Sequence, residues 1–349
     1  MSRPLPPALP RRLMTVPLAL AALPVLLVTL PLWVVVAAAT SPFLPGKLRP
    51  LRLLWFAIVW FACEWAALAA LGWMWLRAGF GRGLGEPRWQ AAHYRLLRWM
   101  LERLYASARR TFRLRVVGSG PGHPLPRDRP LLVLCRHAGP GDSLLLIRAM
   151  VTLAGRHPRI VLKDTLQLDP TIDVLLNRLP NRFITPRPGA AEDIESAIAE
   201  LARDAGPQDA VVIFPEGGNF TERRRLRAIE RLRRLGHADE AAKAERMRHV
   251  LAPKPGGTLA AVAAAPTADV LLVAHEGLED LSTVADMWRG LPMDDVVEVR
   301  WWHVPSEELP RGLDVDAQVD WLFDWWGRLD AWIAEQRVAA GRAPRRVPG

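Results

Sequence analysis

Two long apolar segments open the chain. No charged residue occurs from Leu13 to Gly46, and from Leu53 to Leu76 the only one is Glu64. Each segment is longer than the roughly 20 apolar residues that a helix needs to cross a bilayer. The pattern predicts a helical hairpin in the membrane over residues 1–77.

A signal peptide is the alternative interpretation of the first segment, because Arg11 and Arg12 precede it and Ala37–Ala39 could mimic a cleavage site. The apolar stretch is too long for a signal peptide, and a second stretch follows it, which favours the hairpin. Three prolines lie within the first segment: Pro17, Pro24 and Pro31. Because proline interrupts helical hydrogen bonding, we expect this helix to be kinked or partly re-entrant.

Beyond residue 77 the spacing of apolar positions changes twice. Residues 78–110 place them on one face of a helix, which predicts a helical connector. Over residues 111–338, strand-like runs alternate with helical runs. We expect strands at Phe112–Val117, Leu131–Cys135, Arg159–Leu162, Arg182–Thr185, Ala210–Phe214, Val270–Ala274 and Val296–Trp302. We expect helices at Ser143–Ala154, Ala190–Arg203, Glu222–Leu235 and Asp316–Val338.

This alternation is typical of an α/β domain with a mixed, largely parallel sheet flanked by helices. The domain would follow the membrane hairpin and the connector. Residues 339–349 are predicted to be a disordered tail. Both cysteines, Cys63 and Cys135, lie in or next to apolar runs, which argues against a disulfide framework and against a cysteine-built zinc site.

The chain carries a net charge of +10, and hydrophobic residues make up 50% of it. Such a balance suits an anionic membrane surface, a polyphosphate-bearing substrate or nucleic acid. The predicted helix at residues 222–235 is rich in arginine, and it presents either a solvated face or a surface for lipid headgroups or for the phosphates of coenzyme A. No nucleic-acid motif accompanies this charge, so we expect no nucleic-acid partner.

The first candidate site is the segment His137-Ala-Gly-Pro-Gly-Asp142, between a predicted buried strand and a helix. In α/β sheets, ligands bind at the carboxyl ends of strands, where this loop falls. If Asp142 orients the imidazole of His137, the second ring nitrogen can take a proton from an alcohol. The alternative is that Asp142 only caps the following helix, which is the usual interpretation of such a pair in isolation.

The second candidate site is Phe214-Pro-Glu-Gly-Gly218, which also follows a predicted strand and precedes a helix. Backbone N–H groups at such a turn can bind phosphate. A rival general base, His275, ends another predicted strand.

Together these motifs resemble the glycerolipid acyltransferase family that includes lysophosphatidic acid acyltransferases. Two weaker blocks of the family pattern follow in the expected order. They are Lys163-Asp-Thr-Leu166 with Phe183-Ile-Thr-Pro-Arg187, and Leu251-Ala-Pro-Lys-Pro-Gly-Gly257. The resemblance spans residues 110–280, and a preceding membrane hairpin also fits it.

The resemblance implies a role for each matching residue. His137 would be the general base and Asp142 its orienting partner, while Arg187 and Lys163 would contact the acceptor phosphate. Four further positions would shape the acceptor or the donor side of the site: Glu216 and Gly217 with Gly218 on the acceptor side, and Pro253 on the donor side. Gly218 stands where the family usually has threonine, and Asn219 or Thr221 could replace the missing hydroxyl.

The activity implied is transfer of a fatty acyl group from acyl-CoA or acyl carrier protein to the hydroxyl of a lysophospholipid, with lysophosphatidic acid as the expected acceptor. The thioester is a co-substrate, and neither a cofactor nor a metal is expected. Membrane lipids are the expected partners, and the catalytic domain would face the cytoplasm, where the donors are. Acylation of lysocardiolipin or lysophosphatidylinositol, thioester hydrolysis, and an inactive membrane scaffold are the alternatives.

Overall fold

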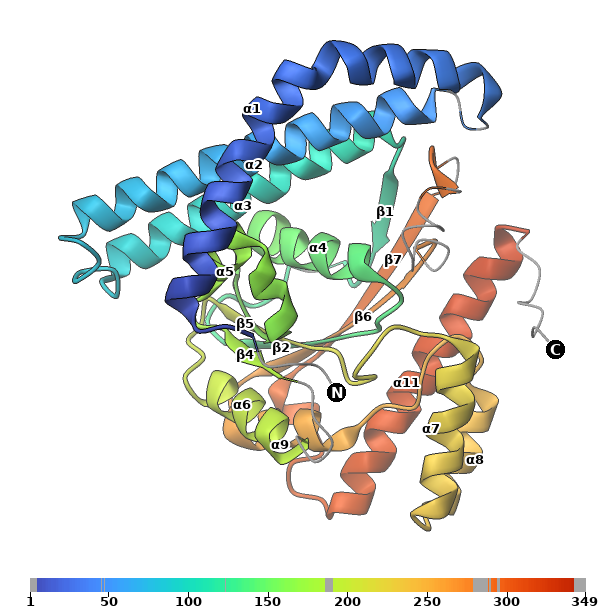
Figure 1. Ribbon diagram of the computed structural model, residues 1–349. Helices are drawn as coiled ribbons and strands as arrows, with labels where there is room; N and C mark the ends of the chain where they lie inside the picture. Colours follow the sequence, from blue (N-terminus) through green and yellow to red (C-terminus); the bar gives the residue numbers. More distant parts are fainter. Residues whose placement is uncertain are drawn as a thin grey trace. The chain divides into compact units, whose positions relative to one another are not determined.

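The two apolar segments form long helices, α1 (Ala8–Thr40) and α2 (Arg49–Arg77), joined through a short 3-10 helix at Ser41–Phe43. Both are long and apolar enough to cross a membrane. Pro17, Pro24 and Pro31 all lie inside α1, which bends along its length (Figure 1). The bend is expected, because each proline removes a backbone donor and its ring clashes with the preceding turn.

The computed structural model describes residues 5–44, 46, 48–122, 124–185, 191–278, 288, 290–293 and 296–341. Contacts group the chain into two compact units. The first comprises Met1–Arg115, Ile147–Ala191 and Trp288–Asp295, and the second Val116–Leu146, Glu192–Met287 and Val296–Gly349.

In the first unit, α2 packs against both α1 and a third helix, α3 (Pro87–Thr111) (Figure 1). The unit also contains a π-helical turn at Met150–Ala154, strands β3 (His157–Lys163) and β4 (Arg182–Ile184), a 3-10 helix at Asp164–Leu168 and the helix α5 (Pro170–Leu176). Strands β3 and β4 pair in parallel.

Buried polar contacts attach the hairpin to α5. The guanidinium of Arg11 binds the carboxylate of Asp173 at 2.9 Å, and Arg12 binds the same group at 3.0 Å. The Thr171 hydroxyl donates to Glu64 of α2 at 2.6 Å, which gives that buried carboxylate a partner. These contacts join the predicted hairpin to a helix from the predicted 111–338 domain.

The second unit contains a sheet with the strand order β1-β7-β6-β2-β5. Its strands are β1 (Arg115–Ser119), β2 (Leu131–Cys135), β5 (Asp209–Ile213), β6 (Asp269–Glu276) and β7 (Val296–Val304). Strand β2 runs parallel to β5 and β6, whereas β6 and β7 are antiparallel. The mixed, largely parallel sheet flanked by helices is thus confirmed.

Helices accompany this sheet. They are α6 (Ala191–Arg203), α7 (Glu222–Arg234), α8 (Ala238–Arg246), α9 (Pro255–Ala264) and α11 (Val315–Ala339), with a 3-10 turn at Ser306–Glu308. Helix α4 (Pro140–Ala149) begins in this unit, α7 packs on α8, and α8 packs on α11. Helix α9 packs on β2, and α11 packs on β6. Every residue of β2, β5 and β6 is buried, as expected of central strands covered on both faces.

The structure departs from the predicted elements at few places. The first strand begins at Arg115 rather than Phe112, because α3 continues to Thr111 and Arg113 adopts a left-handed φ of 60°. Helices α5, α8 and α9 were not predicted, since each is short and α9 opens with Pro-Gly-Gly. Of the predicted disordered tail, residues 342–349 lie outside the described residues.

Candidate active site

Strand β2 places His137 at the carboxyl edge of the sheet in the second unit. The strand is buried between β5 and β6, and the ladder ends where the Arg136 N–H binds the Val273 carbonyl at 3.2 Å. The chain then turns outward, and the His137 side chain remains 19% exposed. An imidazole at this edge is held by a rigid strand yet accessible to a ligand.

Asp142 lies against the His137 ring. Its two carboxylate oxygens are 3.0 Å and 3.1 Å from His137 Nδ1. One of them also accepts hydrogen bonds from the N–H groups of Ala138 at 2.6 Å and Gly139 at 3.0 Å. These bonds run back toward His137, whereas a helix cap would accept from residues further along the chain. The geometry therefore favours the orienting partner over the simple cap.

The charge of Asp142 is stabilised in place. Burial alone would raise the pKa of this carboxyl, but its interactions with His137 and His275 outweigh burial and hold the pKa well below its usual range. Asp142 is therefore a carboxylate at neutral pH, which fixes the proton of His137 on Nδ1 and leaves Nε2 as the acceptor.

The second predicted motif joins the first. The ring of Phe214 lies 4.6 Å from the His137 ring, and the Phe220 N–H donates to the His137 carbonyl at 2.8 Å. Buried Glu216 accepts from the backbone N–H of His137 at 3.2 Å and of Leu251 at 3.1 Å. The structure thus brings together segments that lie about eighty and about a hundred residues apart in the sequence.

Glu216 is held in an apolar interior. Burial raises its pKa to about 8, although the charge of Arg136 and the two backbone donors oppose this shift. Because the pKa in the folded chain exceeds the ordinary value of 4.5, the stabilisation from this group is greatest at low pH and declines as the pH rises toward 8.

Replacing Glu216 with alanine is expected to lower both stability and turnover. Two buried backbone donors would lose their acceptor, at a cost of about 1–3 kcal/mol each, and the loop that carries His137 would lose its attachment to residue 251. Thermal unfolding would show this loss, and we expect the difference from the wild type to shrink as the pH rises from 5 to 8. A variant with an unchanged melting midpoint and rate would contradict this role of Glu216.

Positively charged side chains lie beside the glycine turn that follows Glu216. Gly217 adopts a left-handed φ of 66°, which favours glycine. A Cβ at this position would lie 2.6 Å from Lys254 Nζ, so the flexible lysine side chain lies directly over the turn. A Cβ on Gly218 would lie 3.2 Å from a guanidinium nitrogen of Arg224. Loss of water and the nearby charges of Arg231 and Arg224 lower the pKa of Lys254.

We refer to Lys254, Arg224 and Arg231 as the cationic cluster. All three side chains are exposed, and within the described part of the chain none of them forms an ion pair with a carboxylate. Positive groups gathered without acidic partners beside a glycine turn form a site that an anion can occupy.

The remaining predicted site residues are distributed as follows. Pro253 is buried in the segment joined to the second motif by the Lys254 N–H, which donates to the Pro215 carbonyl at 2.9 Å. Lys163 ends β3 in the first unit with its side chain exposed, and Arg187 lies outside the described residues. Thr221 is, with Asn219, a candidate to replace the hydroxyl that is absent at Gly218. Its hydroxyl caps α7 by accepting a hydrogen bond from the Arg224 N–H.

Two further residues, Arg136 and His275, lie at this edge of the sheet. The fully buried guanidinium of Arg136 donates to the carbonyls of His275 and His249, at 2.7 Å each. His275, considered only as a rival base, lies with Nε2 3.6 Å from the Asp142 carboxylate. His275 is 4% exposed, which leaves it little access to a substrate.

A covalent acyl-enzyme on Cys135 does not fit the geometry. The residue is buried at the end of β2, and burial raises the pKa of its thiol well above the ordinary value. The thiolate is the reactive form, so this cysteine is a poor nucleophile. Among the described residues, no three His, Cys, Asp or Glu side chains are arranged to hold a metal ion.

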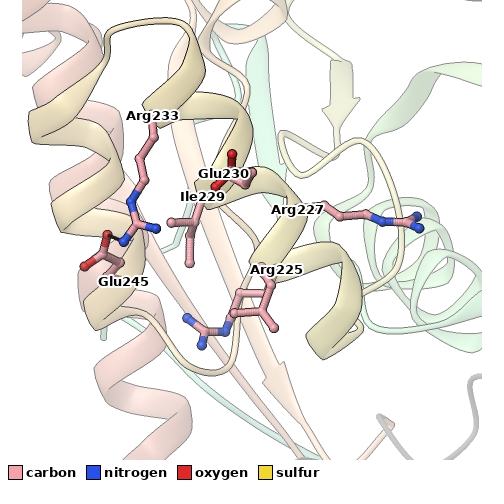
Figure 2. Close-up of a pocket in the computed structure, with 7 residues that line it drawn as sticks. Arg225, Arg227, Ile229, Glu230, Arg233 and Glu245 are labelled. Carbon is pink, nitrogen blue, oxygen red and sulfur yellow. Dashed lines mark hydrogen bonds and ion pairs between the residues drawn. The ribbon is translucent and has the colours of Figure 1, made fainter.

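A separate hollow of about 490 Å³ lies along α7 and α8 (Figure 2). It is lined by Arg225, Leu226, Arg227, Ile229, Glu230, Arg233 and Glu245. An ion pair of 2.6 Å joins Arg233 to Glu245. None of the predicted site residues lines this hollow, which separates it from the chemistry around His137.

Comparisons with known proteins cover the part of the chain that holds these residues. A family model described as acyltransferase matches residues 120–272, which include both main motifs. No curated protein matches the sequence. The fold is similar to the crystal structure of the 1-acyl-sn-glycerophosphate (LPA) acyltransferase PlsC from Thermotoga maritima, with a TM-score of 0.50 and 15% identity over 82% of this chain and 98% of that one.

The fold, the order of the motifs and the matched region lead to one assignment, and the resemblance drawn from the sequence is confirmed at the level of the family. Residues 120–272 are matched by the acyltransferase family model, and this part of the chain is an acyltransferase domain.

Proposed function

We propose that this acyltransferase moves a fatty acyl group from a thioester donor to the free hydroxyl of a lysophospholipid, with lysophosphatidic acid as the acceptor. The observation that carries the proposal is the contact between the His137 ring and the Asp142 carboxylate at 3.0 Å. It leaves one ring nitrogen able to receive a proton at the partly exposed edge of the sheet.

In this mechanism, His137 Nε2 takes the proton from the acceptor hydroxyl as its oxygen attacks the thioester carbonyl carbon. Asp142 stabilises the imidazolium that forms. The tetrahedral intermediate then expels the carrier thiolate, which receives the proton from His137. The products are an ester and a free thiol, and no residue of the chain is acylated.

The cationic cluster supports an acceptor that carries phosphate. Lys254 and Arg224 lie beside the glycine turn, and that turn is joined to His137 through Glu216 and Phe220. The proposed roles of Lys163 and Arg187 would add further positive charge. The protein of similar fold is an LPA acyltransferase, which supports the same acceptor.

The substitution Lys254→Ala is expected to raise the KM for a phosphate-bearing acceptor by several-fold to about a hundred-fold. A charge-assisted hydrogen bond contributes on the order of 1.5–3 kcal/mol, and partial exposure reduces that figure. Arg234→Ala is a matched control, because Arg234 is an exposed arginine of α7 whose ion pair is with Glu230. Steady-state kinetics would contradict the assignment if both variants changed the KM equally.

The proposed location is a membrane with the catalytic domain toward the cytoplasm. Support comes from α1 and α2, whose most apolar windows have mean hydropathies of 2.5 and 1.8. Acyl-CoA or acyl carrier protein would supply the acyl group from the aqueous side, and the lysolipid would enter from the bilayer. The proposed reaction needs no further cofactor.

An acceptor panel tests the proposed function. The purified full chain in mixed micelles would be given labelled acyl-CoA with lysophosphatidic acid, lysocardiolipin or lysophosphatidylinositol. We expect the highest kcat/KM with lysophosphatidic acid. A clear preference for another lysolipid would replace the acceptor, and thioester that stays intact with every lysolipid would favour the inactive scaffold.

A further inference from the structure

A second histidine shares the carboxylate of the site. His275 is 4% exposed, and its Nε2 lies 3.6 Å from an oxygen of Asp142, slightly longer than a hydrogen bond. Within the described part of the chain, neither nitrogen of this ring has a hydrogen-bond partner at ordinary distance. A buried polar group without a hydrogen-bond partner destabilises the folded state, so the position of the His275 ring beside Asp142 requires an explanation.

The sheet holds His275 at this place. Strand β6 runs parallel to β2 with Val273 opposite Cys135, so His275 lies two residues further toward the edge where His137 stands. Val299 of β7 pairs with it on the other side. The Arg136 guanidinium binds the His275 carbonyl at 2.7 Å, which fixes the backbone from a third direction.

We propose that His275 is a positioning residue, which directs its Nε2 toward the Asp142 carboxylate and thereby limits how strongly that carboxylate stabilises the protonated form of His137. This inference rests on the proposed function of His137 as a base. It gives Asp142 two imidazole neighbours with different tasks. His137 exchanges a proton with the substrate, and buried His275 adjusts the carboxylate between them.

The expected effect of His275 arises because several donors share the negative charge of Asp142. Asp142 accepts from His137, from the backbone of Ala138 and Gly139, and from the Ser143 hydroxyl. Each further donor draws electron density from the carboxylate and weakens its attraction for the imidazolium of His137. A base that is too strongly basic would be protonated at neutral pH and unable to accept the hydroxyl proton.

Other charged groups lie around His275, and each has a different partner or direction. Glu276 forms an ion pair with Arg337 at 3.2 Å, Arg136 binds the backbone, and Glu216 contacts the His137 loop. On β7, Glu298 and Arg300 flank the paired Val299. Among the described residues, the charged side chain that the His275 ring approaches is Asp142.

The proposal predicts a direction for the pH profile. Without the donor, the His137 imidazolium is more stable, so the acid limb of kcat/KM moves to higher pH. We expect a shift of about 0.5–1 pH unit for His275→Phe, a modest effect because the contact is longer than an ordinary hydrogen bond. In His275→Gln the side-chain N–H can replace Nε2–H, and the limb should return toward the wild-type position.

The experiment uses the full chain in lipid micelles and compares wild type, His275→Phe and His275→Gln. His303→Phe is the matched control, because His303 is a buried histidine of the same sheet that contacts a different carboxylate, Asp269, at 2.9 Å. We expect the acid limb to move only in His275→Phe. An unmoved limb in that variant, or equal shifts in the Phe and Gln variants, would overturn the proposal.

A second measurement does not depend on acyl transfer. Diethylpyrocarbonate modifies neutral imidazole, so the rate of His137 modification against pH, read by peptide mass spectrometry, reports the protonation of His137 directly. The proposal predicts that His275→Phe shifts this titration upward, even if the chain transfers acyl groups to a different acceptor. An unchanged titration would overturn the role of His275 alone.

Discussion

Replacing His137 with alanine is expected to lower kcat by roughly 10²–10⁴-fold, the usual contribution of a general base. The side chain is at the edge of the sheet and partly exposed, so its removal leaves the strands beneath it intact. The KM values for donor and acceptor should change little, because the imidazole acts mainly in the transition state. Steady-state kinetics and a thermal melt of the same preparation measure both effects.

A folded His137→Ala protein with near-normal turnover would contradict the mechanism. His137→Gln is a useful companion, because it keeps a polar side chain of similar length but cannot take up a proton. Similar losses in the two variants would assign the effect to proton transfer rather than to packing against Phe214.

The second large effect is expected for Asp142→Asn, which should reduce kcat by a similar factor of roughly 10²–10⁴. An amide cannot stabilise the imidazolium, and its NH₂ group would face either the His137 ring or the backbone donors. Because the N–H groups of Ala138 and Gly139 converge on one carboxylate oxygen, we also expect a lower melting midpoint.

If Asp142 were only a helix cap, the asparagine variant would be nearly neutral, since asparagine caps as well as aspartate. The double variant with His137→Ala discriminates further. A pair that works as one unit gives a double variant little slower than the slower single variant. Losses that multiply would show that the two residues act independently.

The sequence predicted which residues lie at this edge of the sheet better than it predicted the contacts between them. Apolar runs such as Leu131–Cys135 identified the buried strands, and the residues directly after them were the candidates for the site. That inference holds because the carboxyl ends of parallel neighbours β2 and β5 meet at one edge. His137 and Glu216 therefore lie together, as their positions after two strands indicated.

Other contacts between side chains could not be predicted from local patterns in the sequence. The approach of His275 to Asp142 follows from the register of β6 against β2, and the place of Lys254 follows from its backbone hydrogen bond to the Pro215 carbonyl. The contact of Arg11 with Asp173 spans 162 residues and joins two segments with no common motif. Long-range pairings of this kind are set by tertiary packing and not by residue spacing.

The central claim is that His137 activates a lipid hydroxyl and not water. The most direct measurement follows the label from a radioactive acyl thioester given to the purified full chain with and without lysophosphatidic acid. The account predicts labelled phosphatidic acid and free thiol in equal amounts, formed only when the acceptor is present and lost in His137→Ala. Labelled free fatty acid released at the same rate with or without acceptor would contradict the account and identify a thioesterase.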